Sequence, residues 1–232
     1  TYGSEKVAEE FARGGAQAIS TPLLNLDTSL RSHLASHLHD WVAGLVGTKD
    51  SSQEQLSRQA DELRAQGFCL YITQDLDEAR EYVRDRYAGV AEKKYGLLAS
   101  RYAKNLVPIG LDNVFHFERV KQLDVAKWFN APTGDPLSCT FLIRPATEFE
   151  SQGLEVELPV ICWGDDFFRE DDEWTLRKRF GHRVDDPLIV RKNAYRVLLT
   201  RGRDGMIVYV PKNERLKETF EFLTNCGVVN FN

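Results

Sequence analysis

The sequence predicts a three-layer α/β domain, in which a parallel β-sheet carries helices on both faces. Short apolar segments alternate with segments of helical length from residue 68 onward, an order typical of a parallel sheet covered by helices. The apolar segments contain few polar residues, as expected for strands that are buried on both faces. With 232 residues, 42% of them hydrophobic, the chain is long enough for one large domain with a complete core.

Residues 1–22 contain few large apolar side chains and include Gly14-Gly15. We therefore expect a linker or a tail from a preceding domain there, and a folded C-terminal domain over residues 23–232. From residue 28 to residue 47, apolar side chains recur at steps of three and four residues, which predicts an amphipathic helix that a glycine ends. A more polar helix is expected over residues 52–66.

Alternating strands and helices complete the predicted pattern. The predicted strands are 68–73, 95–100, 139–144, 156–163 and 206–210. The predicted helices are 75–87, 120–129, 188–199 and 216–224. Residues 105–117 and the acidic segment 164–174 do not fit the alternation, and we expect the acidic segment to be an inserted loop. In parallel sheets, functional groups gather at the carboxyl ends of the strands.

The composition restricts the partners that we expect. A formal net charge of −5 gives no overall attraction to nucleic acid or to anionic membranes, so any nucleic-acid contact must be local. No apolar run approaches the roughly 18 residues of a membrane span, and the first residues show no signal-peptide pattern. We therefore expect a cytoplasmic protein that does not enter membranes. The four cysteines lie far apart, with no C-x-x-C pair, which is typical of reduced, buried thiols.

Arginines and glycines cluster between the predicted helix 188–199 and the predicted strand 206–210. Arg201 and Arg203 directly precede the predicted strand 206–210. A guanidinium group can bind two phosphate oxygens at once, so this arrangement suits phosphate recognition. The alternative is a solvated helix end whose arginines interact with the carboxyl end of the helix dipole.

Three segments resemble motifs of superfamily 1 helicases. Residues 195–203, which end in Thr200-Arg201-Gly202-Arg203, are similar to motif VI. Residues 147–155, which end in Gln152-Gly153-Leu154-Glu155 before a predicted strand, are similar to motif V. Residues 26–32, a leucine followed by Arg31-Ser32, resemble motif IV.

A closer resemblance is to a bacterial family of predicted DNA/RNA helicases related to the helicase half of Schlafen proteins. Residues 95–100, 146–155, 162–165 and 191–201 carry it. The resemblance runs from about residue 23 to the end. It implies the RecA-like version of the predicted fold, of the P-loop NTPase type, and specifically the second motor domain of a superfamily 1 helicase or translocase.

The resemblance also implies roles for individual residues. Arg201 is expected to reach the γ-phosphate of ATP as an arginine finger, assisted by Arg31 and Arg203. The residues expected on the nucleotide side of the cleft are Gln152, Gly153 and Glu155. Contacts to a single strand of DNA or RNA are expected on the opposite surface. The residues expected there are Ser100, Arg101, Lys104, Thr147 and Phe149.

The loop G-x-x-x-x-G-K-[ST], which binds phosphates in nucleotide motors, does not occur in the 232 residues. Gly44, Gly47 and Lys49 stand in a different order after a predicted helix, so we expect a helix stop there. The family places the loop and the acidic residues that manage Mg²⁺ in a preceding domain. We therefore expect ATP with Mg²⁺ to be bound mainly by an N-terminal RecA-like domain, which would be this domain's partner, and we expect the isolated chain not to hydrolyse ATP.

Two alternatives differ from a motor. In the first alternative, this domain is a regulatory or docking module of a nuclease or defence protein. In the second it is a metal-dependent nuclease built on Asp165, Asp166 and the acidic residues after them. Those carboxylates are consecutive, which is more typical of a solvated loop, and we expect no metal site. His33, His37 and His39 lack companion ligands, and the basic residues 177–183 are expected to form a solvated face, with contact to a phosphate backbone as the alternative.

Overall fold

The computed structural model describes residues 33–111, 123–177 and 186–231. One compact unit runs from His37 to the C-terminus. Arg31 and the predicted tail, residues 1–22, lie outside the described residues.

A five-stranded parallel sheet forms the centre of this unit, in the strand order β2-β3-β6-β1-β7. The strands are β1 (Cys69–Thr73), β2 (Leu97–Ala99), β3 (Val160–Cys162), β6 (Gly205–Tyr209) and β7 (Val229–Asn230). The inner strands β3 and β6 are buried along their whole length, as their continuous apolar sequences predict. Because every strand runs the same way, all the carboxyl ends lie at one end of the sheet.

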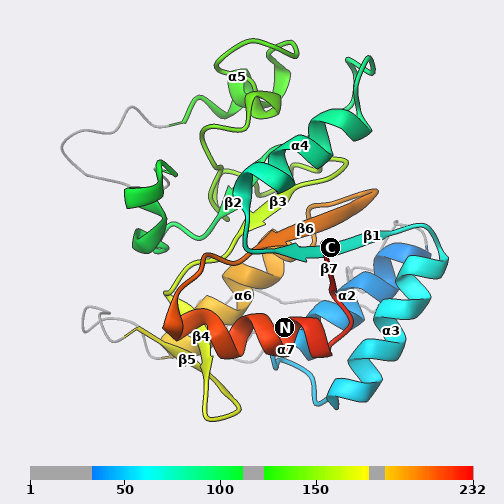
Figure 1. The fold of residues 1–232 in the computed structure, drawn as a ribbon, viewed down its shortest axis with the longest axis vertical. Helices are drawn as coiled ribbons and strands as arrows, with labels where there is room; N and C mark the ends of the chain where they lie inside the picture. The colour runs from blue at the N-terminus through cyan, green and yellow to red at the C-terminus, as the bar shows by residue number, and fades with distance from the viewer. Residues whose placement is uncertain (1–32, 112–122, 178–185, 232) are drawn as a thin grey trace, which may run out of the picture. The chain divides into compact units, whose positions relative to one another are not determined.

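Helices cover both faces of the sheet (Figure 1). On one face, Ala79 and Val83 of α4 (Leu76–Arg86) pack with Leu97, Val160 and Ile207 of the strands. The helices on the other face are α2 (His33–Leu45), α3 (Gln53–Ala65), α6 (Pro187–Leu199) and α7 (Lys217–Asn225). This arrangement is the predicted three-layer α/β fold of the RecA-like type.

Local sequence determines where these helices begin and end. Ser52 and Asp75 precede α3 and α4, and each side chain accepts a hydrogen bond from backbone N–H groups of the first turn. Asp186 caps α6 in the same way, and Pro187 occupies its first position. Gly47 follows α2 with φ +68°, so the predicted helix stop is confirmed.

Several of the predicted elements differ from the structure. The strand expected over 156–163 forms only over β3, Val160–Cys162. Residues 139–144 were expected to form a strand, but Cys139–Phe141 form a 3-10 helix. Ser138 caps this turn through the backbone N–H of Thr140, and the edge of the sheet is instead extended by a parallel bridge between Leu98 and Ala146. The helix expected over 120–129 is shorter, α5 (Val125–Asn130), and its first predicted residues lie outside the described residues. Residues 105–117 also did not fit the predicted alternation. The first of them belong to another 3-10 helix, Lys104–Ile109.

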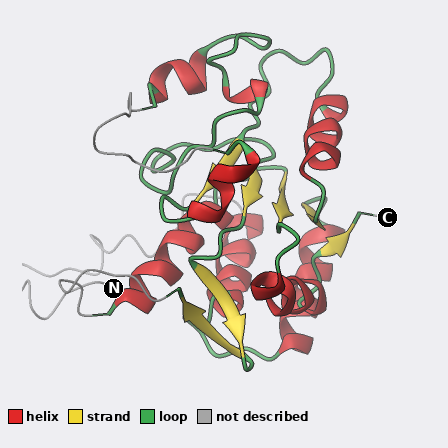
Figure 2. Ribbon diagram, turned by 60° about the vertical axis from the view of Figure 1, so that its left-hand side comes forward, coloured by secondary structure: helices red, strands yellow, loops and turns green. Residues whose placement is uncertain are grey.

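The acidic segment 164–174 is not a loop, as we expected, but most of a β-hairpin (Figure 2). Strands β4 (Phe167–Glu170) and β5 (Glu173–Leu176) pair antiparallel. Asp171 and Asp172 form the two-residue turn with φ of 53° and 62°, a conformation that aspartate tolerates better than most residues. The hairpin forms because the rings of Phe167 and Trp174 are buried and stack with centroids 4.3 Å apart.

Among the described residues, the structure has no helix that is both long and apolar enough to cross a membrane. The four cysteine thiols are free, as predicted, and three are buried, whereas Cys69 is half-buried.

Replacing Gly205 with alanine tests the close contact between β1 and β6. Gly205 has φ +153°, and a Cβ there would lie 2.3 Å from the carbonyl oxygen of Cys69. We expect Gly205→Ala to lower the free energy of unfolding by about 2 kcal/mol or more, since the backbone must shift. Gly67→Ala is the control, because Gly67 has φ +89° with open space around it and should lose only about 1 kcal/mol. Urea denaturation compares them; equal losses would argue against the contact.

Candidate functional site

The predicted site residues lie at opposite ends of the sheet. Gln152, Gly153 and Glu155 precede β3, and Arg201 and Arg203 precede β6, so these residues lie toward the amino ends of the strands. Ser100 and Arg101 follow β2, so they lie at the carboxyl ends. The general expectation that functional groups gather at the carboxyl ends therefore applies to only one of the two predicted groups.

Backbone pairing brings the motif V and motif VI segments together. Val156 forms a parallel bridge with Gly202. The Val156 N–H donates to the carbonyl oxygen of Arg201 at 3.0 Å, and the Arg203 N–H donates to that of Val156 at 2.9 Å. Residues that are about 45 positions apart in the sequence thus form one surface.

Arg201 is half-buried and bonded to backbone groups of both segments. Its Nε donates to the carbonyl oxygen of Val197 in the last turn of α6 at 3.0 Å, and a terminal nitrogen donates to that of Leu154 at 3.2 Å. A cation at a helix carboxyl end is electrostatically favourable. The guanidinium group therefore covers the end of α6 and contacts the motif V segment at the same time.

Two ion pairs lie in the segment that directly follows Arg201. Arg203 Nε lies 3.0 Å from Glu155 Oε2, and Lys93 Nζ lies 3.4 Å from Asp204 Oδ2. The side chain of Arg203 is 59% exposed. Gly153 has φ +81°, and a Cβ at this position would have open space around it among the described residues, so its backbone is accessible to an approaching group.

At the carboxyl end of β2, an arginine lies against two aromatic rings. The guanidinium carbon of Arg101 is 5.3 Å from the centroid of the Tyr102 ring and 5.2 Å from that of Phe149. Phe149 is 60% exposed and Tyr102 is 39% exposed. Lys104, two residues after Tyr102 in the sequence, is also exposed. These side chains form a partly apolar, positively charged surface, which we call the Arg101 platform (Arg101, Tyr102, Lys104 and Phe149).

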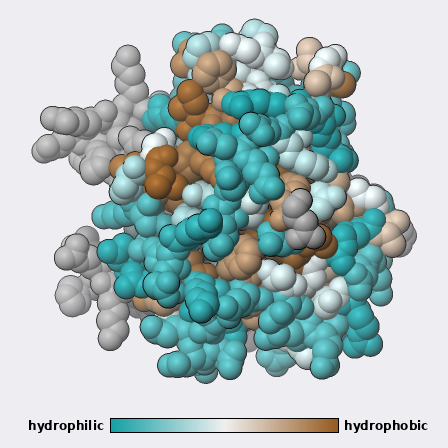
Figure 3. All heavy atoms as spheres, in the orientation of Figure 1, coloured by the Kyte–Doolittle hydropathy of each residue, from teal (hydrophilic) through white to brown (hydrophobic). Residues whose placement is uncertain are grey.

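Hydrophilic side chains cover most of the face shown in Figure 3, and hydrophobic residues reach it only in small patches. Among the described residues, Tyr102 and Phe149 are the exposed large aromatic side chains, and an exposed aromatic beside cations is typical of a binding surface.

Two of the predicted nucleic-acid residues are buried instead. Ser100 is completely buried, and its hydroxyl donates to Asp166 Oδ2 at 2.7 Å. Thr147 is also buried, and its backbone N–H donates to Glu150 Oε2 at 2.8 Å. The Ser100 hydroxyl and the Thr147 backbone N–H therefore hold the loops that carry the Arg101 platform.

Sequence reasoning missed a buried polar network beneath this platform. Arg191 of α6 lies with its Nε 3.1 Å from Asp166 Oδ2, and another nitrogen donates to Ser100 Oγ at 2.9 Å. The Tyr195 hydroxyl donates to Asp166 Oδ1 at 2.9 Å and accepts from the Gly164 N–H at 3.0 Å. Burial raises the pKa of Asp166, and Arg191 opposes that rise. The available signal was Arg191 itself, a charged residue on a largely apolar helix.

The acidic run has a structural explanation that does not involve metal ions. Asp165 and Asp166 bind different arginines: Asp165 Oδ2 accepts from Arg177 at 2.7 Å and from Arg215 at 3.4 Å, whereas Asp166 pairs with Arg191. Within the described ranges, no three His, Cys, Asp or Glu side chains are grouped as metal ligands. His37 Nδ1 lies 3.1 Å from Gln66 Nε2.

Comparison with protein families agrees with this arrangement. A family model described as "Schlafen group 3, DNA/RNA helicase domain" matches residues 1–212. The chain belongs to this family. The match includes all residues of the Arg101 platform and both segments that carry Gly153, Glu155, Arg201 and Arg203, which we call the Arg201 surface. This Schlafen-type helicase domain therefore has a helicase-related function. No significant match was found among curated proteins.

The paired burial of Asp166 and Arg191 in the helicase domain can be measured with a double-mutant cycle. Removing one partner leaves the other charge buried, so we expect Asp166→Leu and Arg191→Met each to cost about 3–5 kcal/mol of folding free energy. The double variant should cost clearly less than the sum, because no unpaired charge remains. Urea denaturation of the four proteins measures this; additive losses would mean that the two side chains do not stabilise each other.

Burial of Glu148 predicts that the stability of the helicase domain depends on pH. Burial raises the pKa of Glu148 above the ordinary value of 4.5, although the hydrogen bond that its carboxylate accepts from the Arg101 backbone N–H opposes the rise. A raised folded-state pKa means that the protonated form favours folding, and this stabilisation is lost as pH rises from about 4.5 through the raised value. Glu148→Gln keeps an acceptor oxygen without the charge.

We therefore expect the stability of Glu148→Gln relative to the wild type to increase with pH above about 4.5 and then to level off. Denaturation curves at a series of pH values measure this difference. Glu221→Gln, on the exposed face of α7, controls for loss of one charge. A difference that does not change with pH would contradict the buried environment of Glu148.

Proposed function

We propose that this domain is the second RecA-like domain of a superfamily 1 DNA/RNA helicase or translocase. In this proposal it supplies arginines to an ATP site that an N-terminal RecA-like domain of the same protein completes, and it binds part of a single strand of DNA or RNA. One observation carries the proposal. The Val156–Gly202 bridge groups Gly153, Glu155, Arg201 and Arg203 at one end of the sheet, and the Arg101 platform lies at the other end.

The residues of the Arg201 surface are compatible with a polyphosphate. Arg203 is largely exposed, and the open backbone at Gly153 allows close approach of a ligand. The guanidinium groups of Arg201 and Arg203 would neutralise charge that develops on the γ-phosphate when the two domains close, an effect of about 10³-fold or more for arginine fingers. ATP with Mg²⁺ supplies the phosphoryl group, and the partner domain holds most of it.

The Arg101 platform is suited to a single strand. Bases stack on exposed aromatic rings such as Phe149, and cations such as Arg101 and Lys104 bind the backbone. Closure and opening of the two domains, alternating with hydrolysis, would change the grip on the strand and move the protein along it.

Replacing Arg201 in the protein that contains both domains tests the motor function. We expect Arg201→Ala to lower single-strand-stimulated ATP hydrolysis by about 10³-fold while nucleotide binding persists, because the partner domain holds the nucleotide. The matched control is Arg196→Ala, which removes an exposed arginine from α6, the helix that ends just before Arg201. Hydrolysis is followed by phosphate release with and without single-stranded DNA or RNA.

An ATPase rate that Arg201→Ala leaves at the level of Arg196→Ala would overturn the arginine-finger role. A parent protein with no ATPase activity at all would favour the alternative, a non-motor regulatory or docking module.

A further inference from the structure

Three side chains at the carboxyl ends of the strands form a cluster that the proposed function has not used. The Asp165 side chain is only 6% exposed, and its Oδ2 accepts hydrogen bonds from Arg177 at 2.7 Å and from Arg215 at 3.4 Å. Arg177 directly follows β5, and Arg215 lies in the segment between β6 and α7. We call this cluster the arginine clasp (Asp165, Arg177 and Arg215).

The arginine clasp has an excess of positive charge that faces solvent. Two guanidinium groups share one carboxylate, so one positive charge is not neutralised within the cluster. The carboxylate is on the inside: Asp165 Oδ1 is buried, with no hydrogen-bond partner among the described residues. The cations are on the outside, since the side chains of Arg177 and Arg215 are 54% and 43% exposed. Each guanidinium carries five N–H donors and directs only some of them at Asp165.

The surroundings fix the clasp in position before any ligand binds. The Asp165 backbone N–H donates to Asn105 Oδ1 at 2.9 Å, and the Arg215 guanidinium lies 5.3 Å from the ring centroid of buried Phe168. The neighbouring Asp166 is locked by Arg191 and Tyr195. Side chains that are already ordered lose less entropy on binding, so the clasp is preorganised for an anion.

The acidic residues of the hairpin lie away from the clasp. The hairpin turn Asp171–Asp172 lies at the closed end of the hairpin, whereas Arg177 follows Leu176, which pairs with Phe167 at the open end. Leu176 lies three residue steps along the strand from Glu173, a distance of about 10 Å. Asp166, next to Asp165, is paired with Arg191, and Glu214, which precedes Arg215, is exposed.

The clasp and the Arg101 platform lie along the same end of the sheet. The platform follows β2, Asp165 follows β3, and Arg215 follows β6, and these three strands are neighbours. Adjacent strands are about 4.8 Å apart, so the two groups lie within a few nucleotides of each other. Lys104 of the platform is next to Asn105, which holds the Asp165 backbone.

We propose that the arginine clasp is a binding site for a backbone phosphate of single-stranded DNA or RNA. Arginine pairs favour phosphate oxygens because the planar guanidinium group can engage two of them. The proposal rests on the proposed nucleic-acid function and assigns a phosphate contact beside the base-stacking platform. Such a contact adds affinity without base preference.

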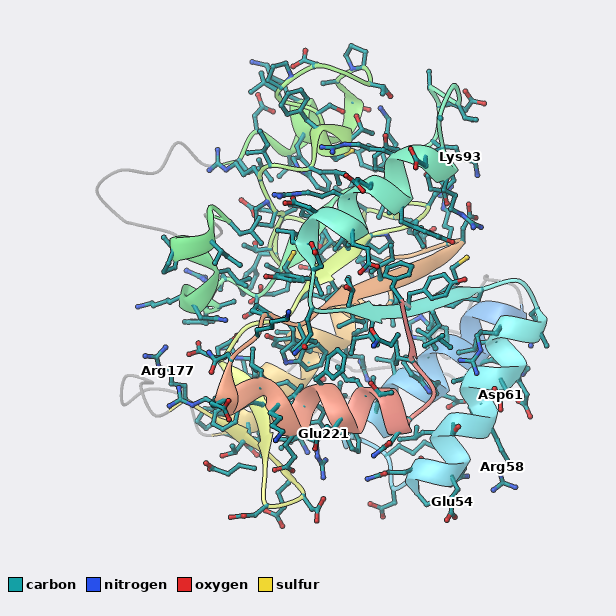
Figure 4. All side chains as sticks on the ribbon, viewed as in Figure 1. Glu54, Arg58, Asp61, Lys93, Arg177 and Glu221 are labelled. Carbon is teal, nitrogen blue, oxygen red and sulfur yellow. The ribbon has the colours of Figure 1, made fainter. Side chains whose placement is uncertain are left out.

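The experiment measures binding of a fluorescein-labelled 20-nucleotide oligothymidylate and of its RNA counterpart to the purified chain, by anisotropy at several salt concentrations. The variants are Arg177→Ala, Arg215→Ala and the double variant. The matched control is Arg58→Ala: Arg58 is an exposed arginine on α3, on the opposite side from Arg177 in Figure 4. Phe149→Ala separately tests the Arg101 platform, and urea denaturation checks that each variant folds.

For each clasp arginine we expect about a fivefold loss of affinity at 0.1 M salt, on both DNA and RNA, and a slope of log K against log salt that is less negative by about 0.7. The double variant should lose about 25-fold in affinity, and its slope should be less negative by about 1.4. Arg58→Ala should behave like the wild type.

Two outcomes would overturn the clasp, and they differ. If the wild type binds, Phe149→Ala weakens binding and the clasp variants match Arg58→Ala, then the phosphate site is wrong and the proposed function stands. If the wild type binds neither oligonucleotide, the nucleic-acid function fails, and the clasp fails with it.

Discussion

The buried ion pair between Asp166 and Arg191 constrains the whole carboxyl end of the sheet. It joins three segments that are distant in sequence: Asp166 follows β3, Arg191 belongs to α6, and Ser100, which bonds to both, follows β2. A charge taken out of water is costly unless partners meet it at close range, so these segments must keep their relative positions. The Arg101 platform on one side and Asp165 on the other are each one residue away from this network, and their geometry depends on it.

Aromatic packing positions a residue that bonds to the Asp166–Arg191 pair. The Tyr195 ring lies 4.4 Å from that of Trp163 and 5.0 Å from that of Phe167, while its hydroxyl reaches Asp166. The ring buries apolar area and its polar tip meets the carboxylate, so one side chain serves both the core and the network. The hairpin contributes Phe167 to this cluster, which gives the acidic segment a reason to fold back on the domain.

Helix α6 is the element that both candidate surfaces share. Arg191 lies in its second turn, and Arg201 lies just beyond its end, with its guanidinium group bonded to Val197 of the last turn. The helix has 13 residues, which corresponds to about 20 Å of stiff rod. A displacement of α6 at the Arg201 surface therefore reaches Arg191, and through Ser100 it reaches the loop of Arg101. The nucleotide side and the strand side of the proposed motor are joined by one rigid element.

The sequence predicted the elements whose signal is local. Continuous apolar runs predicted β1 and β6, and the segments of helical length over 75–87 and 188–199 predicted α4 and α6. The hairpin was missed because its acidic turn dominates the segment, while the reason for pairing, the stacking of Phe167 on Trp174, is a tertiary contact. The adjacency of Glu155 and Arg203 came from resemblance to known motifs, since the Val156–Gly202 bridge that creates it spans about 45 residues.

Buried arginine was the hardest feature to anticipate. An arginine on a helix is normally exposed, and no sequence pattern near Arg191 predicts Asp166 or Ser100 as its partners. The same is true of the clasp, in which Arg177 and Arg215 meet a carboxylate from a third segment. Contacts of this kind are set by topology, because parallel strands bring the residues after β2, β3 and β6 to one end of the sheet.

An acidic protein can offer cationic surfaces if its carboxylates are used to position its arginines. The chain has a net charge of −5, yet Arg203 lies on Glu155, and Arg177 and Arg215 lie on Asp165. At Asp165 the carboxylate is buried and the guanidinium groups are exposed. The charge that the clasp exposes to solvent is therefore positive, although the net charge of the chain is negative. Recognition of an anion then depends on local burial of the negative partner, which net charge does not reveal.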